Sequence, residues 1–289
     1  MTRAQGNRPT VREIGPHTQL CGVILHPAGH TLSPAMHNAA FAALGLDAVY
    51  AAFDVRPEQL GAALSGARAL GIRQLAVSIP HKEAVIEHLD EVDETARRIG
   101  AVNTVTRRGE RLVGSNTDWI GAVRALERVT SLAGRDVVVL GAGGSARAVV
   151  FGALERGARV AVLNRDVERA ARLAKELGAG STGRLEDLAR TPCDVLVNAT
   201  SVGLRSDVSP VSAEAIPRGA VLLDLVYDPV QTRLLREGEA RGARVVSGKW
   251  MLVLQAAEQI ALWSGRGAPV DEMARAFDRA SERSPAQPA

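Results

Sequence analysis

Residues 135–166 read RDVVVLGAGGSARAVVFGALERGARVAVLNRD, and this stretch decides the class of fold. The apolar run VVVL predicts a buried strand, the glycines after it a tight turn, and the apolar segment that follows a helix. RVAVL then predicts a second strand. Strand, glycine turn, helix and strand within about thirty residues open a dinucleotide-binding fold with a parallel sheet.

The glycine turn indicates where a nucleotide would bind. In GAGGSAR, Gly141 and Gly143 occupy the first two glycine positions of the dinucleotide fingerprint, and Ala146 the third. Glycine lets the backbone approach a pyrophosphate, and the helix after the turn offers free N–H groups and its positive end. A plain turn between strand and helix is the alternative, and the strand and helix on either side favour the nucleotide site.

The end of the second strand bears on the choice of cofactor. NAD sites usually carry Asp or Glu there, which binds the ribose 2′-hydroxyl. Here Asn164 is neutral, and Arg165 and Arg169 can bind a 2′-phosphate. Asp166 opposes that phosphate, since both are negative. The segment predicts NADP, with NAD as the weaker alternative.

Apolar segments alternate with helical patterns on both sides of this unit. Strands are expected at 20–25, 47–53, 73–78, 101–107, 194–198, 220–225 and 243–246, and two helices, 250–264 and 271–280, near the end. Such alternation predicts an α/β fold with mostly parallel sheets covered by helices. A chain of 289 residues is long enough for two domains, each with its own core.

Composition excludes several classes of function. The net charge is +3, aromatic residues make up 3%, and the basic residues form no cluster, so nucleic-acid binding is not expected. The chain has neither an apolar leader nor a run of about eighteen apolar residues, which argues against secretion and membrane insertion. Cys21 and Cys193 lack the spacing of a metal site, and we expect buried thiols of a cytoplasmic protein.

One lysine stands out. Of the 35 basic Lys and Arg residues only three are lysines: Lys82, Lys175 and Lys249. Lysine can exchange a proton in a protein, whereas arginine cannot. Lys82 is therefore either a solvated residue that opens a helix over 81–89 or a proton-exchanging group in a site.

Nine blocks in order tell these readings apart. Polar residues such as Ser33, Asn103 and Asn116 could each cap a helix or form a turn. Together with Lys82 they fall in segments that resemble the shikimate dehydrogenase family over about residues 20–265. These are HPAGHTLSPAMHN (26–38), VSIPHKE (77–83), GAVNTV (100–105), GSNTDWIG (114–121), GAGGSAR (141–147), NRDVERA (164–170), NATSVG (198–203), DLVYDP (224–229) and SGKWMLVLQ (247–255).

The resemblance implies a domain plan and an activity. The polar segment 1–18 predicts a flexible tail. The resemblance implies a substrate domain (19–118), a Rossmann-type NADP domain (119–248), and C-terminal helices (249–289) that complete the substrate domain. The expected reaction is the reversible NADPH-dependent reduction of 3-dehydroshikimate to shikimate, on the chorismate route to aromatic amino acids. The partners would be these small molecules, without nucleic acid or membrane, and a homodimer is compatible.

The resemblance also implies a role for each site residue. Lys82 and Asp118 would be the catalytic pair. Substrate would be bound by Thr31, Ser33, Ser78, Asn103, Asp118, Tyr227 and Gln255. Cofactor would be bound by Gly141, Ala142, Gly143, Gly144, Ser145, Asn164, Arg165 and Arg169, with the backbone of Leu225 and Gly248. No metal is expected.

Four positions depart from the family pattern, and three alternative functions stay open. The family's Gly-Asn is Leu25-His26, its first serine is Thr31, its Asn-Val-Thr is Ala76-Val77-Ser78, and its Asn-Arg-Thr ends in Asp166. A quinate or dual quinate/shikimate dehydrogenase is the nearest alternative. A non-catalytic nucleotide-binding regulator would be expected to lack Lys82 or Asp118. A metal enzyme built on His26, His30 and His37 is disfavoured by their spacing.

Overall fold

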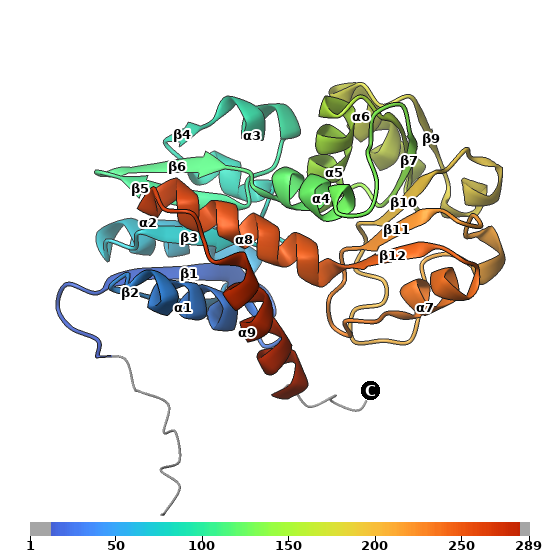
Figure 1. The fold of residues 1–289 in the computed structure, drawn as a ribbon. Helices are drawn as coiled ribbons and strands as arrows, with labels where there is room; N and C mark the ends of the chain where they lie inside the picture. The colour runs from blue at the N-terminus through green and yellow to red at the C-terminus, as the bar shows by residue number, and fades with distance from the viewer. Residues whose placement is uncertain (1–12, 284–289) are drawn as a thin grey trace, which may run out of the picture.

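Two six-stranded sheets organise the computed structural model, which describes residues 13–283 (Figure 1). The first sheet has the strand order β2-β1-β3-β5-β6-β4, and the second the order β12-β11-β10-β7-β8-β9. Each sheet with its helices forms one lobe, and the two lobes lie side by side. The two-domain α/β fold is thus confirmed. Residues 1–12 of the expected tail, and 284–289, lie outside the described residues.

The first sheet is parallel on one side and carries a hairpin on the other. β1 pairs with β2 and β3 in parallel, whereas β5 is antiparallel to both β3 and β6. The hairpin was not predicted; it turns at Gly109, whose φ of 62° suits glycine. The strands are β1 (Gln19–Leu25), β2 (Ala48–Asp54), β3 (Gln74–Val77), β4 (Glu91–Val92), β5 (Thr104–Arg108) and β6 (Arg111–Ser115).

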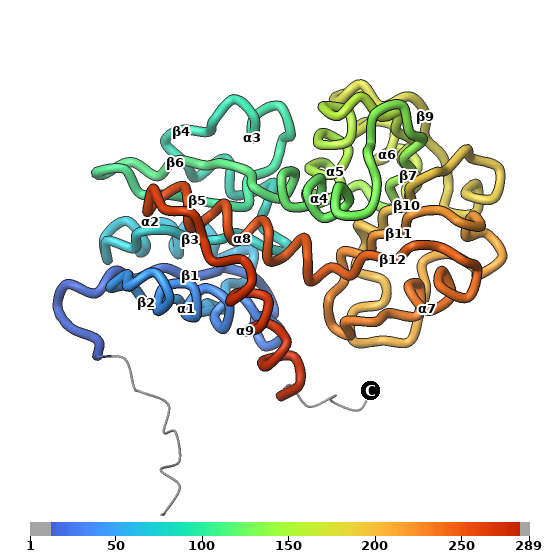
Figure 2. Tube along the Cα trace, viewed as in Figure 1, coloured from blue at the N-terminus to red at the C-terminus, as the bar shows by residue number. Residues whose placement is uncertain are grey.

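Helices from both ends of the chain cover this sheet. Phe41 and Phe277, both fully buried, lie in one core cluster with Ile260, so the C-terminal helices complete the first lobe (Figure 2). The helices of this lobe are α1 (Ser33–Leu44), α2 (Leu60–Ala69), α3 (Glu94–Ile99), α8 (Gly248–Ser264) and α9 (Val270–Arg283), with 3₁₀ turns at Pro57–Gln59 and Ala84–His88.

The α-helix expected over 81–89 is wrong, since only the 3₁₀ turn at Ala84–His88 forms there. The backbone explains why. The carbonyl of Lys82 accepts a hydrogen bond from the N–H of Val102 (2.8 Å), so the chain beside Lys82 is bound to a neighbouring segment. Lys82 is therefore held by the segment that leads into β5, and it lies before the turn.

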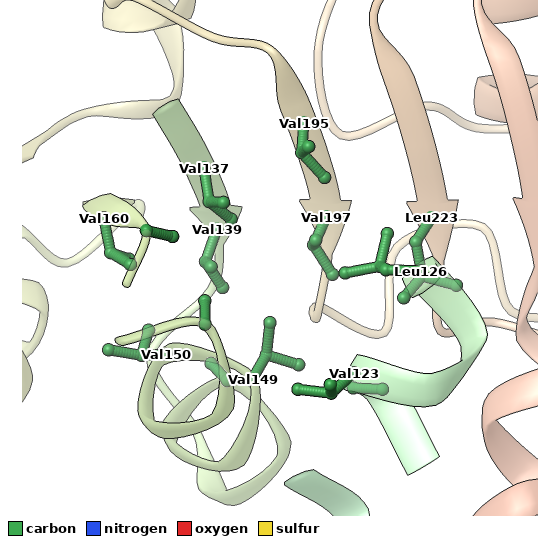
Figure 3. Close-up of a cluster of buried hydrophobic side chains, with 14 of the residues drawn as sticks. Val123, Leu126, Val137, Val139, Val149, Val150, Val160, Val195, Val197 and Leu223 are labelled. Carbon is green, nitrogen blue, oxygen red and sulfur yellow. The ribbon is translucent and has the colours of Figure 1, made fainter. Parts of the chain in front are cut away.

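The second lobe is a fully parallel sheet with helices on its faces. Figure 3 shows Val137 and Val139 of β7 facing Val149 of α5 in its main core. The strands are β7 (Asp136–Leu140), β8 (Arg159–Leu163), β9 (Ser181–Gly183), β10 (Val195–Asn198), β11 (Val221–Asp224) and β12 (Arg244–Ser247). The helices are α4 (Asp118–Glu127), α5 (Gly144–Glu155), α6 (Val167–Leu177) and α7 (Arg233–Ala240), with 3₁₀ turns at Leu185–Arg190 and Ala213–Ala215.

Helices α4 and α8 join the lobes where they cross at Gly121. A Cβ atom placed on Gly121 would lie 2.8 Å from the carbonyl oxygen of Met251 and 2.8 Å from Cβ of Gln255. Only glycine permits so close an approach of the two backbones. The crossing fixes Asp118, the first residue of α4, beside the side chains of α8.

Both cysteines are free thiols. Burial raises the pKa of Cys21 and of Cys193 to about 12. Neither thiol is therefore reactive near neutral pH. Within residues 13–283 the helices fall short of the length and apolar character that crossing a membrane requires.

Candidate active site

A cleft between the lobes collects most of the expected site residues. It lies at the carboxyl ends of β1, β3 and β11, where open α/β sheets bind ligands. Its lining includes every expected substrate residue together with Lys82, Ser145, Leu225 and Gly248. The other cofactor candidates lie outside this lining: Gly141, Ala142, Gly143, Gly144, Asn164, Arg165 and Arg169.

Lys82 and Asp118 form an ion pair across the floor of the cleft. Nζ of Lys82 lies 2.5 Å from Oδ2 of Asp118, and the two side chains are only 13% and 5% exposed. Asp118 begins α4, where the positive end of the helix stabilises a carboxylate. Its second oxygen, Oδ1, accepts a hydrogen bond from Nδ2 of Asn103 (2.8 Å). The carboxylate is held at both oxygens, so Lys82 has one defined position.

Buried amides connect this pair to α8. Nδ2 of Asn103 also donates to Thr117 Oγ1 (2.9 Å) and to Gln255 Oε1 (3.2 Å). Nε2 of Gln259 donates to the carbonyl of Asn103 (3.2 Å) and to Thr104 Oγ1 (2.9 Å). A hydrogen-bond network of this kind fixes the orientation of each amide. The C-terminal helix therefore helps to position the pair.

Hydroxyl groups gather at the other end of the cleft. Ser33 was a candidate helix cap, but it is the first residue of α1 and makes no capping hydrogen bond. Burial raises the pKa of Tyr227 to about 12, against the effect of a hydrogen bond with the Thr31 side chain. The phenol thus stays protonated and can donate. Three hydroxyls facing one space suit a carboxylate ligand.

The glycine loop 141–144 is shaped for close contacts. Gly141 has φ of 110°, and a Cβ there would lie 3.1 Å from the carbonyl of Ala199. A Cβ on Gly144 would lie 2.9 Å from Cβ of Lys82, so the loop packs against the catalytic candidate. No side chain caps the N-terminus of α5, which leaves its N–H groups for a ligand such as a pyrophosphate.

The corner between β8 and α6 shows what Asp166 does. Oδ1 of Asp166 accepts a hydrogen bond from the N–H of Arg169 (3.0 Å), which makes it the N-cap of α6. Threonine is also a good N-cap, so the change from the family's Asn-Arg-Thr keeps this function. Arg169 crosses the glycine loop: Nε donates to the Ala142 carbonyl and Nη2 to Oε1 of Glu83, each at 2.9 Å. Arg165 is exposed.

Some contacts at the cleft were not foreseen. Nδ1 of His26 lies 2.7 Å from Oδ1 of Asp54 at the rim. Gln259 follows Gln255 by four residues on one helix, so helical spacing was the signal that could have found it. His30 lines the cleft, and burial lowers its pKa. Among residues 13–283, no His, Cys, Asp or Glu side chains group as a metal site would require.

The glycine loop of the second lobe meets in this cleft the pair formed by Lys82 of the first lobe and Asp118 at the start of α4. This combination defines a two-domain, nicotinamide-dependent dehydrogenase. Comparison with family models identifies the kind of dehydrogenase more closely. Residues 23–105 match the shikimate dehydrogenase substrate binding domain, 124–215 match shikimate/quinate 5-dehydrogenase, and 248–276 match the shikimate 5′-dehydrogenase C-terminal domain. The chain belongs to the shikimate dehydrogenase family.

Individual relatives agree over nearly the whole chain. A shikimate dehydrogenase (NADP⁺) of Thermococcus kodakarensis is 51% identical over 86% of this chain and 92% of its own. A crystal structure of a shikimate dehydrogenase with NADP⁺ is 39% identical, with a TM-score of 0.89, over 94% of this chain and 99% of that one. The Thermus thermophilus enzyme, solved with NADP(H) and shikimate, is 42% identical, with a TM-score of 0.85, over 91% and 99%.

Proposed function

We propose that this protein catalyses the reversible NADP-dependent reduction of 3-dehydroshikimate to shikimate. The observation that carries the proposal is the buried Lys82–Asp118 pair, which faces a cleft between a hydroxyl-rich end and the glycine loop. The names and bound ligands of close relatives support the same substrate and cofactor.

Lys82 would act on the oxygen of the reacting carbonyl. The nicotinamide, when bound, supplies or accepts the hydride. As negative charge develops on the substrate oxygen, the Lys82 ammonium stabilises it and gives it a proton. Asp118 orients the ammonium and stabilises its charge, and Asn103 in turn fixes Asp118. In the reverse direction Lys82 takes the proton from the alcohol.

The remaining residues would determine orientation. Thr31, Ser33 and Tyr227 offer hydroxyls to the substrate carboxylate, and Ser78, Asn103 and Gln255 would bind the ring hydroxyls. On the cofactor side, the loop 141–145 would bind the diphosphate. Asn164, Arg165 and Arg169 would bind the 2′-phosphate, and the backbone of Leu225 and Gly248 would complete the site.

The domain assignment and the compartment belong to the same proposal. We assign substrate recognition to residues 19–118 with the helices after 249, and cofactor binding to 119–248. The core cluster shared by α1, α8 and α9 supports that division. Two free thiols, Cys21 buried and Cys193 partly buried, support action in the cytoplasm, where thiols stay reduced.

Steady-state rates with shikimate and with quinate, each with NADP and NAD, test the proposal. Shikimate with NADP should give the highest kcat/KM. A higher value with quinate would make this a quinate dehydrogenase. Nucleotide binding without turnover on either substrate would identify a nucleotide-binding regulator.

A further inference from the structure

Besides Asp118, Lys82 has a second partner, and this one lies on α5 of the second lobe. Nζ of Lys82 donates to Oγ of Ser145 at 3.0 Å. Ser145 is the second residue of α5 and follows directly on the glycine loop. The contact joins residues 63 positions apart. It therefore exists only when the two lobes are packed together.

The neighbourhood of this contact is crowded on both sides. The aliphatic part of the Lys82 side chain packs against Gly144, where an added Cβ atom would lie 2.9 Å from Cβ of Lys82. Ser145 is half-buried and lines the cleft together with Lys82 and Asp118. The hydroxyl thus lies between the ammonium of Lys82 and the free N–H groups at the start of α5.

We propose that Ser145 is a positioning residue that couples binding of the cofactor diphosphate to the state of Lys82. The inference rests on the proposed function. A serine hydroxyl accepts with two lone pairs and donates one proton. While Oγ accepts from Lys82, its own proton can go to a phosphate oxygen bound at the N-terminus of α5. A hydroxyl that donates becomes a stronger acceptor, so a bound diphosphate strengthens the hydrogen bond that Ser145 Oγ accepts from the Lys82 ammonium.

This arrangement gives Ser145 two separable functions. Its backbone N–H contributes to anion binding at the helix start, and any residue there keeps it. Its hydroxyl alone reaches Lys82. Ser145→Ala removes the hydroxyl and preserves the N–H, and Ser145→Thr restores a hydroxyl.

The first measurement is steady-state kinetics. We expect Ser145→Ala to lower kcat for shikimate oxidation by about 10- to 150-fold, the range for loss of one hydrogen bond to a charged group. KM for shikimate should stay within about twofold, because the hydroxyl contacts Lys82 and the substrate groups are elsewhere. Ser145→Thr should recover most of the rate. Ser65→Ala is the matched control, since Ser65 lies on α2 and, within residues 13–283, its hydroxyl donates to the carbonyl of Gly61 in its own helix.

The second measurement does not depend on turnover. Acetic anhydride labels free amines, and with three lysines in the chain each site is readily followed by mass spectrometry. The probe is 2′-phospho-ADP-ribose, which carries the diphosphate and lacks the nicotinamide that would cover Lys82. In the native chain the probe should slow labelling of Lys82 by about threefold or more, because the ammonium form does not react. Exposed Lys175 serves as the internal reference.

In Ser145→Ala the probe should slow the labelling of Lys82 by less than half the factor seen in the native chain. Ser145→Thr should restore the native factor. Equal protection of Lys82 in the native chain and in Ser145→Ala, at saturating probe, would overturn the inference whatever the activity. A native chain that shows this protection but does not oxidise shikimate would refute the proposed function and leave the coupling intact.

Discussion

Lys82 is one of only three lysines in a chain that fills its other basic positions with arginine, and its proposed role explains the choice. Lys82→Arg retains the positive charge and removes the exchangeable proton. We expect kcat to fall by about 10²–10⁴, the usual contribution of a general acid or base. NADP affinity, measured by quenching of tryptophan fluorescence, should change little because most of the proposed cofactor contacts lie on the other lobe.

Asp118→Asn provides the matched test of the pair, and the two losses should be strongly non-additive because the residues act as one unit. Near-normal turnover of Lys82→Arg would show that Lys82 is only an electrostatic anchor and that the proton comes from another group.

Asp224 illustrates a buried acid with a structural role. Burial raises its pKa from 3.8 to about 6, although Thr232, Val226 and Asn198 donate hydrogen bonds to it. The folded state therefore binds the proton more tightly than the unfolded chain. The contribution of this group to stability is full below about pH 4 and is lost as pH rises through about 6, an effect of roughly 3 kcal/mol.

Asp224→Asn should flatten the dependence of the unfolding free energy on pH between about 4 and 6, measured by urea denaturation. Asp136→Asn is the control of opposite sign, since hydrogen bonds from Arg159 lower the pKa of Asp136. An unchanged slope in Asp224→Asn would mean that Asp224 titrates normally in the fold.

Residue identities could be predicted where the chemistry is local to a motif. The glycine loop belongs to that group, whereas the pairing of Lys82 with Asp118, 36 positions away, was predicted only from the family resemblance. The contact of Lys82 with Ser145 could not be predicted, because it joins two lobes whose packing no local pattern encodes. The same holds for the contact of Gln259 with Asn103, 156 positions away, although helical spacing from Gln255 indicates Gln259 itself.

Among the elements, the crossing of α4 and α8 depends most on one residue. Gly121→Ala would force a carbon to within 2.8 Å of the Met251 carbonyl, so the helices must separate. We expect a loss of about 1–3 kcal/mol in unfolding free energy. KM for shikimate should also rise, since Gln255 is displaced.

Gly66→Ala on α2 is the matched control, because a Cβ there meets nothing within 4 Å. It should stabilise the protein by about 0.5–1 kcal/mol. Wild-type stability and KM in Gly121→Ala would show that the crossing can widen without cost.

The corner between β8 and α6 makes a prediction about cofactor choice. Arg165→Ala should weaken NADP binding by about 1.5–3 kcal/mol and leave NAD nearly unchanged, because only NADP carries the 2′-phosphate. Asp166→Thr should improve NADP binding, since it keeps the cap of α6 and removes a negative charge. Calorimetric titration with both cofactors measures the two effects. Equal losses for both cofactors in Arg165→Ala would show that this side chain does not contact the phosphate.

Most strands and helices could be predicted from apolar periodicity, and the failures have local causes. The segment after Lys82 has a helical pattern, yet the carbonyl of Lys82 accepts a hydrogen bond from the N–H of Val102 and is not free to begin a helix. The hairpin of β5 and β6 was read as one strand followed by irregular chain, because the short turn at Gly109 carries little signal. Long-range backbone pairing decided both cases.

For the molecule as a whole, the Glu83–Arg169 ion pair connects the lobes beside the proposed cofactor site. Both side chains are nearly half exposed, so the pair adds little to stability. It does compete with a 2′-phosphate for the same guanidinium. Glu83→Gln should therefore tighten NADP binding severalfold, by up to about 1 kcal/mol, and leave NAD unchanged. Unaltered NADP affinity would mean that the phosphate and Glu83 use different N–H groups of Arg169.

The return of α8 and α9 to the first lobe has a consequence during synthesis. On the ribosome the nucleotide lobe has all its strands once Ser247 has emerged, while Phe41 and its neighbours on the first sheet still lack their cover. At about 5–20 residues per second, α8 and α9 follow over the next several seconds. Until then Gln74 lacks the carbonyl of Gln259, 185 residues downstream, to which its side-chain amide donates a hydrogen bond in the folded protein. The half that is translated first is thus finished last, and nascent chains should need chaperone protection mainly on their N-terminal half.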